Sequence, residues 1–275
     1  MLYCFQYVDT GRCPCVADRE GVLRGMGAHP ANVMATNQGA INLLRGRWTA
    51  LLGHLSELSV PLPTPNDPWT VFQLANPGIE TGDIAVEVKP VLFNVRERAS
   101  FSGRPSLYVV ARGTLVLERA TLGAGRIRIV GFSTEVGYFR LTKDASLEHV
   151  YGTHYDFAVD QIGHPIFHGQ VKSFSSKFLA TVEDAVGPCP SVDRVEGILE
   201  RVRMPTAQMD FFSLILQICA DHYFSDSMDE ETRLKIRALL ETSRTMEGAG
   251  FKRTPTSNVE CMRAGHWYSA PPAPL

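Results

Sequence analysis

Several features that would assign the chain to a common functional class are missing from its sequence. No run of residues approaches the roughly 18 apolar residues that a membrane-spanning helix needs. The Gly-x-Ser-x-Gly motif and the Gly-Lys-Ser/Thr loop do not occur, and neither does a dinucleotide-binding fingerprint, which argues against α/β-hydrolases and nucleotide hydrolases. The formal net charge is only −2, so no overall field directs the chain to nucleic acid or to an anionic membrane.

The spacing of the six cysteines fits no zinc-binding pattern well. Cys13 and Cys15 are too close for the two-residue ligand knuckle of a zinc site, and no second pair with the right spacing follows. The first residues lack the basic and apolar regions of a secretory signal. We therefore expect a cytoplasmic protein in which most cysteines act as small apolar side chains, with Cys219 the clearest case.

What the sequence does contain is a block of strand patterns between two helical regions. Residues 83–175 hold five strand patterns joined by short turns, which favours antiparallel pairing because parallel strands need long crossovers. Residues 1–60 predict a strand and a helix, residues 191–245 a helical group, and residues 254–275 a mobile tail. We predict one α+β domain over residues 1–275: a curved antiparallel sheet of about five or more strands, packed against the N-terminal helix and the C-terminal helical group.

Local signals add detail to this fold. Pro90 interrupts a strand and cannot donate a backbone hydrogen bond, so it indicates an edge position or a β-bulge. Trp69 and Phe72 lie in a proline-rich loop that we expect to return both rings to the core. The charge order of residues 192–203 predicts a short helix. Thr206 is expected to cap the strongly apolar helix that follows, whose composition predicts burial against the sheet or an oligomer contact.

The most distinctive stretch is residues 153–170, which hold three of the eight histidines. Its even positions are mainly polar and its odd positions mainly apolar, as expected for two strands of a hairpin with one polar face. An odd-length turn around Gly163 would keep the same parity on the same face. The register then places three polar pairs opposite each other: Asp160 with His164, Asp156 with His168, and His154 with Gln170.

Imidazole and carboxylate groups that converge across adjacent strands can bind a divalent metal ion. The predicted ligands are His154, Asp160 and His164. Such an ion would lower the pKa of a bound water and produce a hydrolytic nucleophile. The sequence thus raises the hypothesis of a metal-assisted hydrolase acting on a phosphodiester or a similar substrate.

The same face could also act without a metal ion. Asp156 would orient the imidazole of His168 as a general base, and these two are the predicted catalytic residues. Gln170, Lys172 and Arg140 are the predicted substrate-binding residues, the two cations as clamps for an anion.

Two other interpretations stay open. In one, the polar positions form a solvated sheet face whose His–Asp pairs are each worth a fraction of a kcal/mol. In the other, the protein is a non-catalytic module whose curved sheet and apolar helix, within residues 206–224, bind a small ligand, a protein partner or a second copy of the chain. If that helix is buried within the chain, the version with a partner loses its main support.

His149 is a separate case, because its parity is opposite to that of His154. A regular strand would place it among the core residues. Gly152 could instead mark a β-bulge that resets the parity.

Overall fold

The structure is a computed structural model, and it describes residues 37–76, 82–96, 106–122, 128–157, 167–197, 202–206, 209–224 and 229–244. All of these residues fall within one compact unit, Val33–Leu275. The expected N-terminal strand, the tip of the 153–170 hairpin and the C-terminal tail lie outside the described residues. Those expectations, and the single domain over 1–275, stay predictions.

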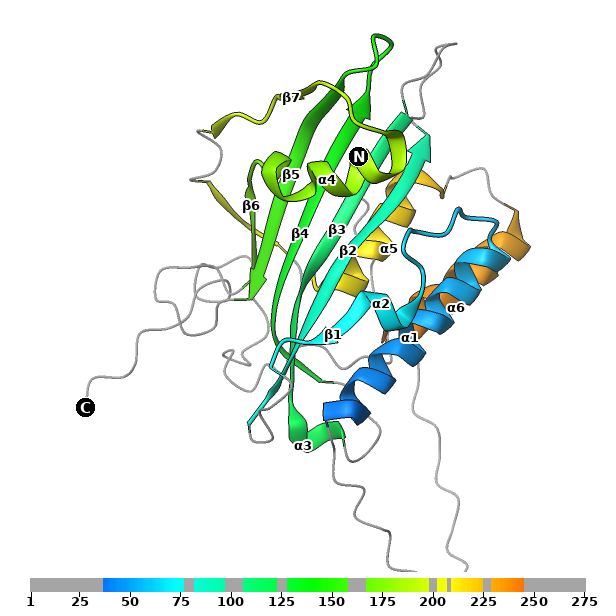
Figure 1. Ribbon diagram of the computed structural model, residues 1–275. Coiled ribbons are helices and arrows are strands. Elements are labelled where there is room, and N and C mark those ends of the chain that lie inside the picture. Colours follow the sequence, from blue (N-terminus) through cyan, green and yellow to red (C-terminus); the bar gives the residue numbers. More distant parts are fainter. Residues whose placement is uncertain are drawn as a thin grey trace, which may run out of the picture. The chain divides into compact units, whose positions relative to one another are not determined.

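An open, mainly antiparallel sheet forms the centre of the fold (Figure 1). The predicted α+β class with a curved antiparallel sheet is confirmed. The exception to antiparallel pairing is the short strand β7 (Ser191–Asp193), which lies off the main path and pairs in parallel with β5. The other strands follow each other across the sheet in this order: β1 (Phe72–Leu74), β2 (Ile84–Arg96), β3 (Ser106–Leu117), β4 (Ile129–Leu141), β5 (Leu147–Phe157), β6 (Phe167–Val171) and β8 (Arg203–Pro205).

Helices lie on both sides of this sheet. In Figure 1, α4 crosses in front of the strands and α5 lies behind them, while α1 and α6 pack against each other. None of the described helices is long and apolar enough to cross a membrane. The helices are α1 (Asn37–Glu57), α2 (Pro68–Val71), α3 (Arg119–Leu122), α4 (Ser175–Val186), α5 (Phe211–His222) and α6 (Glu230–Arg244).

Pro90 produces the β-bulge that the sequence predicts. The pairing of β2 with β3 shifts register between Val88 and Val91. Since a proline has no backbone N–H, it fits where the ladder is already interrupted. The side chains buried toward α5 change parity there: Ile84, Val86 and Val88 come before the bulge, and Val91, Phe93 and Val95 after it.

The main core lies between the sheet and the helices α1 and α5, and aromatic rings form its centre. Trp48 of α1 meets Phe72 of β1 edge-to-face at 6.1 Å, and Phe72 stacks on Phe212 of α5 at 5.9 Å. The indole N–H of Trp48 donates to the carbonyl of Asn66 at 3.0 Å. This bond satisfies the only polar atom that the ring brings into the core.

Trp69 does not follow Phe72 into the core, so half of the prediction for this loop is wrong. Its side chain is 63 % exposed. The guanidinium of Arg45 lies 3.8 Å from the centre of the indole ring. This cation–π contact accommodates the ring at the surface, where α2 turns it away from the sheet.

The helix predicted over residues 192–203 is also wrong in the part that the structure describes. Ser191–Asp193 forms β7 beside β5, and Arg203–Pro205 forms β8 beside β6. Both short strands take up backbone hydrogen bonds that the outer part of the sheet would otherwise leave open. The predicted helix rested on charge order alone, which is worth less than these pairings.

Asp210, and not Thr206, caps α5. The Asp210 carboxylate accepts hydrogen bonds from the backbone N–H groups of Phe212 and Ser213, at 3.0 and 3.2 Å. Thr206 instead continues the sheet, because its backbone N–H donates to the carbonyl of Phe167 at 3.1 Å. The helix begins several residues later than predicted because residues 203–206 are held by β6.

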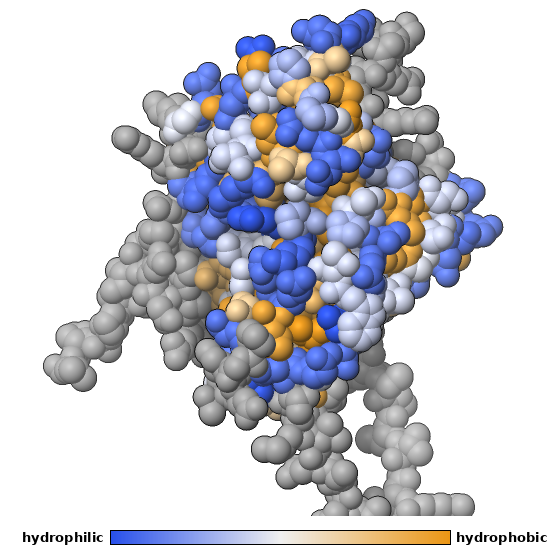
Figure 2. All heavy atoms as spheres, viewed as in Figure 1, coloured by the Kyte–Doolittle hydropathy of each residue, from blue (hydrophilic) through white to orange (hydrophobic). Residues whose placement is uncertain are grey.

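A second, smaller core lies on the opposite face, under α4, a helix that the sequence patterns do not predict. Phe174, Phe178 and Val182 pack there on side chains of β2, β3, β4 and β5. Gly137 of β4 allows this approach, because a Cβ atom at its position would lie 2.7 Å from the ring of Phe178. Hydrophilic residues cover much of the middle of this face (Figure 2).

Candidate functional site

The hairpin register is the one that the sequence predicts. Asp156 on β5 pairs with His168 on β6, and His154 pairs with Gln170. The third predicted pair, Asp160 with His164, lies outside the described residues. Period-2 alternation therefore placed the described polar side chains on one face correctly.

This face continues across two more strands and meets α4. Glu135 of β4 pairs with His154, and Arg112 of β3 pairs with Glu135. The Glu135 carboxylate accepts from Arg112 Nε at 2.7 Å and from Lys177 Nζ of α4 at 2.6 Å, and His154 Nδ1 lies 3.7 Å away. We call the side chains of Arg112, Glu135, His154, Asp156 and His168 the polar face.

Glu135 is the centre of this network. Its residue is only 7 % exposed. Burial alone would raise the pKa of its carboxyl group, but the nearby imidazole of His154 and the hydrogen bonds from Lys177 and Arg112 outweigh burial and lower the pKa far below its usual range. Glu135 is thus a permanently ionised group whose charge is balanced by its neighbours.

His154 and Asp156 form the second charged pair of the polar face, with Nε2 of the imidazole in close contact with Oδ2 of the carboxylate. Burial lowers the pKa of His154, but the carboxylates of Asp156 and Glu135 reverse the direction and raise it. Burial raises the pKa of Asp156, yet His154 and His168 lower it overall. The pair therefore holds a proton on the imidazole more tightly than a free histidine would.

His168 lies deeper than a catalytic base on an open sheet face would. The residue is 3 % exposed, and its charge acts on Asp156 across the two strands. The register brings the predicted pair Asp156 and His168 together. The imidazole of His168, however, is enclosed within the protein and has little contact with solvent.

The predicted substrate-binding residues are only partly brought together. Gln170 shares the face of His154, and Lys172 is close enough to act on the pKa of His154. Arg140 pairs with Glu148 at the other end of β4, and it points to the opposite face from its neighbour Phe139, which packs under α4. At about 3.3 Å per residue it lies roughly 16 Å along the strand from Glu135, too far to act at the polar face.

His149 shares the face of His154, because a bulge resets the parity. Phe139 pairs with His149 while Tyr138 pairs with Tyr151, so Val150 is the extra residue on β5. The imidazole is buried against Phe139 at 4.7 Å. The bulge interpretation is thus confirmed, with the extra residue two positions before Gly152.

The contacts of His149 indicate a structural role. Its Nδ1 lies 3.1 Å from Oδ1 of Asp193 on β7. Burial lowers the pKa of His149, and the hydrogen bond to Asp193 opposes this without reversing it. A neutral imidazole that attaches β7 to β5 accounts for this arrangement.

The predicted metal site stays a prediction. Two of its three ligands, Asp160 and His164, lie outside the described residues. Within the part of the chain that the structure describes, no group of three or more His, Cys, Asp or Glu side chains is arranged to hold a metal ion.

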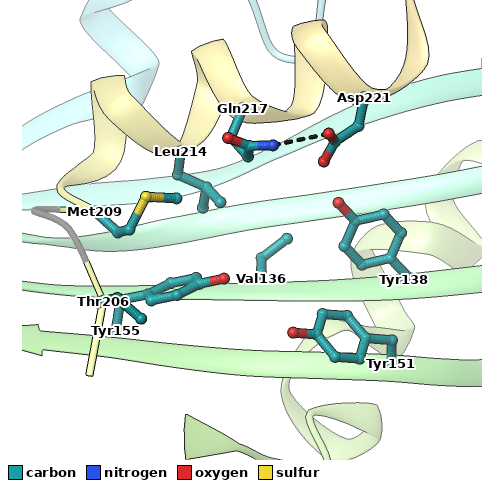
Figure 3. Close-up of a pocket in the computed structure, with 9 residues that line it drawn as sticks. All are labelled: Val136, Tyr138, Tyr151, Tyr155, Thr206, Met209, Leu214, Gln217 and Asp221. Carbon is teal, nitrogen blue, oxygen red and sulfur yellow. Dashed lines mark hydrogen bonds between the residues drawn. The ribbon is translucent and has the colours of Figure 1, made fainter. Parts of the chain in front are cut away.

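A cavity of about 320 Å³ lies between α5 and strands β4 and β5, on the side of these strands that is turned away from the polar face (Figure 3). Tyr138 of β4 and Tyr151 and Tyr155 of β5 contribute their rings to its wall. Gln217 and Asp221 close it from α5. We call this cavity the tyrosine pocket; Val136, Thr206, Met209 and Leu214 complete its lining.

Polar groups converge in the tyrosine pocket. The hydroxyl of Tyr138 points toward Asp221, and that of Tyr155 points toward Val136 (Figure 3). Gln217 Nε2 donates to Oδ1 of Asp221 at 2.7 Å. The ring of Tyr138 meets that of Tyr151 edge-to-face at 5.6 Å. The pocket therefore combines an apolar floor with phenol, amide and carboxylate groups.

Two tyrosine hydroxyls of the tyrosine pocket have raised pKa values. Burial and then the charge of Asp221 raise the pKa of the Tyr138 hydroxyl. Burial and then Tyr151 raise the pKa of Tyr155 to about 12. Both phenols therefore stay neutral at physiological pH, where each can donate and accept a hydrogen bond.

The two-residue alternation does not reveal this pocket, because it places the odd positions of β5 in the core. Tyr155 falls among these apolar positions, although a tyrosine on a buried face still needs a partner for its hydroxyl. The second signal was Gln217 and Asp221, which stand four residues apart and interrupt an otherwise apolar helix. A polar pair on such a helix, facing several tyrosines, is the pattern that could have indicated a cavity.

No family model matches this chain, and no curated protein or solved structure matches it either.

Proposed function

We propose that this protein is a non-catalytic module that binds a small organic ligand in the tyrosine pocket. The observation that carries this proposal is the cavity of about 320 Å³ between α5 and strands β4 and β5. Its volume falls at the small end of the ~300–1,000 Å³ of ligand pockets. A mostly apolar wall with a few converging polar groups is also typical of such sites.

The burial of α5 favours a small ligand over a protein partner. Phe211, Phe212, Leu214, Ile215, Ile218 and Cys219 of this helix are all buried within the chain. The apolar face that suggested an oligomer or partner contact is therefore occupied by the chain's own core. The cavity is formed at the more polar side of the same helix, where Gln217 and Asp221 lie.

A fragment screen by ligand-observed NMR tests this proposal on the full chain. Tyr151 is suited to the test because it is 39 % exposed, so Tyr151→Ala removes part of the pocket wall without opening the core. Trp69→Ala is the matched control, since it removes an exposed aromatic ring that is not part of the pocket lining. We expect fragments to bind the wild type and the Trp69 variant and to lose binding in the Tyr151 variant. A screen without binders, or binding that does not depend on Tyr151, contradicts the proposal.

Phosphodiester hydrolysis at the polar face is a second candidate. The observation that favours it is the position of Asp156 between His154 and His168, which lower the pKa of its carboxyl group. In this proposal Asp156 orients an imidazole that acts as general base, alone or beside a metal ion held with residues of the hairpin tip.

Hydrolysis of bis(p-nitrophenyl) phosphate, with and without added Mn²⁺ or Zn²⁺, tests this second candidate. Asp156→Asn should abolish any turnover. Asp184→Asn, which removes an exposed carboxylate on α4, should leave it unchanged. Absence of turnover by the wild type under all metal conditions removes the candidate.

The proposed compartment is the reducing cytoplasm. Both cysteines that the structure describes, Cys189 and Cys219, are free thiols. Burial raises the pKa of Cys219 to about 12, as expected for a cysteine that serves as an apolar core residue.

A further inference from the structure

We propose that the ligand of the tyrosine pocket is an organic ammonium ion with a compact apolar body. This inference rests on the proposed function and specifies the chemical class of its ligand. The ammonium group would lie at Asp221, and the apolar body would lie on Val136, Leu214 and Met209.

The charge of the lining is the first argument. Asp221 is the one ionisable acid or base among the nine lining residues other than the tyrosines, and none of the nine is a lysine, arginine or histidine. The ring of His222 contacts that of Tyr138, with 5.8 Å between the centroids, but His222 is not among the lining residues. In the lining that the structure describes, a carboxylate without a basic residue favours a cation and repels an anion.

The position of the carboxylate is the second argument. The Gln217 amide donates to Oδ1 of Asp221 at 2.7 Å and so fixes the orientation of the side chain. Oδ2 can then accept a hydrogen bond from a ligand. An N⁺–H group makes a stronger bond to such an oxygen than a neutral donor does.

The tyrosines supply the third argument. The negative charge of Asp221 is felt inside the cavity, since it contributes to the raised pKa of both Tyr138 and Tyr155. The same field that disfavours a phenolate favours a positive charge. Because the hydroxyls stay neutral, their oxygens can accept hydrogen bonds from the remaining N–H groups of an ammonium ion.

The apolar floor and the volume of the cavity limit the polarity and the size of the ligand's body. Val136, Leu214 and Met209 offer an apolar surface opposite the polar groups. A cavity of about 320 Å³ admits a body of roughly one substituted ring or a short branched chain, since it is near the lower limit of ligand pockets. A long acyl chain or a nucleotide does not match this shape and charge.

The test is an NMR titration of the ¹⁵N-labelled full chain at neutral pH with three probes of similar shape. They are 2-phenylethylammonium, the neutral 2-phenylethanol and the anion 3-phenylpropionate. Each is titrated into the wild type, into Asp221→Asn and into the control Asp184→Asn. The asparagine at position 221 keeps an oxygen for Gln217, and the control makes the same charge change on α4, at the other face of the sheet.

We expect the ammonium probe to bind the wild type about fivefold more tightly than the alcohol, the upper value for one exposed ion pair. This preference should disappear in the Asp221 variant and persist in the Asp184 variant. The anion should bind most weakly. The shifted backbone amides should lie in β4, β5 and α5.

The contrary outcomes are separable. If the alcohol or the anion binds as tightly as the ammonium ion, the cation inference is wrong and the ligand pocket stands. If the preference survives in Asp221→Asn, the assignment of the charge to Asp221 is wrong. If none of the probes shifts amides of the pocket, this inference fails, and the fragment screen decides separately whether the proposed function stands.

Discussion

The two faces of strands β4 and β5 differ in how they treat their polar groups. On the face toward α4, Glu135 is contacted by Arg112, Lys177 and His154, and Asp156 is contacted by His154. On the face toward α5, polar groups surround a cavity of about 320 Å³. Histidines, acids and bases that lie this close together balance one another's charge, whereas the few polar groups around the cavity can still bind a ligand.

The cores on the two faces of the sheet differ in size. Substitutions in these cores should have the largest effect on the free energy of unfolding. Trp48→Ala removes a fully buried ring that touches three phenylalanines. We expect it to lower the free energy of unfolding by about 4–5 kcal/mol. Phe178→Ala under α4 should cost about 3 kcal/mol, because fewer rings surround it. Urea denaturation followed by circular dichroism measures both, and a larger loss at Phe178 would reverse the comparison.

Gly152 tests how tightly the α4 face is packed. A Cβ atom at this position would lie 2.2 Å from the carbonyl oxygen of Lys172, a backbone atom that cannot move aside easily. Gly152→Ala should therefore destabilise the protein by about 2–3 kcal/mol.

Gly46→Ala in α1 is the matched control, because its Cβ atom would meet nothing within 4 Å. It should stabilise the helix by about 0.5–1 kcal/mol. Thermal unfolding of the two variants gives the comparison, and equal melting temperatures would show that the close approach at Gly152 is not tight.

Glu135 tests whether the polar face is a structural network. Glu135→Gln leaves Arg112 and Lys177 without their charge partner. Since both cations are partly exposed, we expect a loss of about 2 kcal/mol rather than the full cost of breaking a buried pair. Glu87→Gln, which breaks the exposed pair with Lys89, should cost less than about 0.5 kcal/mol. Similar losses in the two variants would mean that the network contributes no more than a surface ion pair.

His154 gives the smallest effect, which depends on pH. Folding raises the pKa of His154. The contribution of His154 to the free energy of unfolding is therefore complete below its ordinary pKa of about 6.5, and it is lost as the pH rises through the pKa of the folded protein. Asp156 has a lowered pKa, so its contribution is lost only on acidification below about 4.

The free energy of unfolding of the wild type should therefore exceed that of His154→Gln by about 1 kcal/mol near pH 5.5 and by less near pH 8. Chemical denaturation at the two pH values measures the difference. His54→Gln, which removes an exposed ion pair with Glu57, is the control. A difference that grows with pH would contradict the assignment of the proton to the His154–Asp156 pair.

Local patterns predicted the features that depend on the chain's near neighbours. Alternation of polar and apolar residues gave the register of Asp156 with His168, because a strand turns successive side chains to opposite faces. Pro90 gave the bulge in β2 because its missing N–H acts at its own position. The α+β class followed from the order of strand and helix patterns.

The errors concern residues whose structure is set by distant partners. Residues 192–203 have a helical charge order, but their ends add strands to β5 and β6. Trp69 has the composition of a core residue, but α2 directs it to Arg45. Thr206 could cap a helix, yet Phe167 holds its backbone in the sheet.

Which side chains share a face of the hairpin follows from the two-residue period of a strand and can be predicted from local sequence alone. Which face is closed and which is hollow depends on how the helices pack onto the sheet. The placement of α4 brings Lys177 onto Glu135, and the placement of α5 leaves space beside Tyr138, Tyr151 and Tyr155. Both placements depend on packing between residues far apart in the chain, and no local period encodes the volume that such packing fills or leaves open.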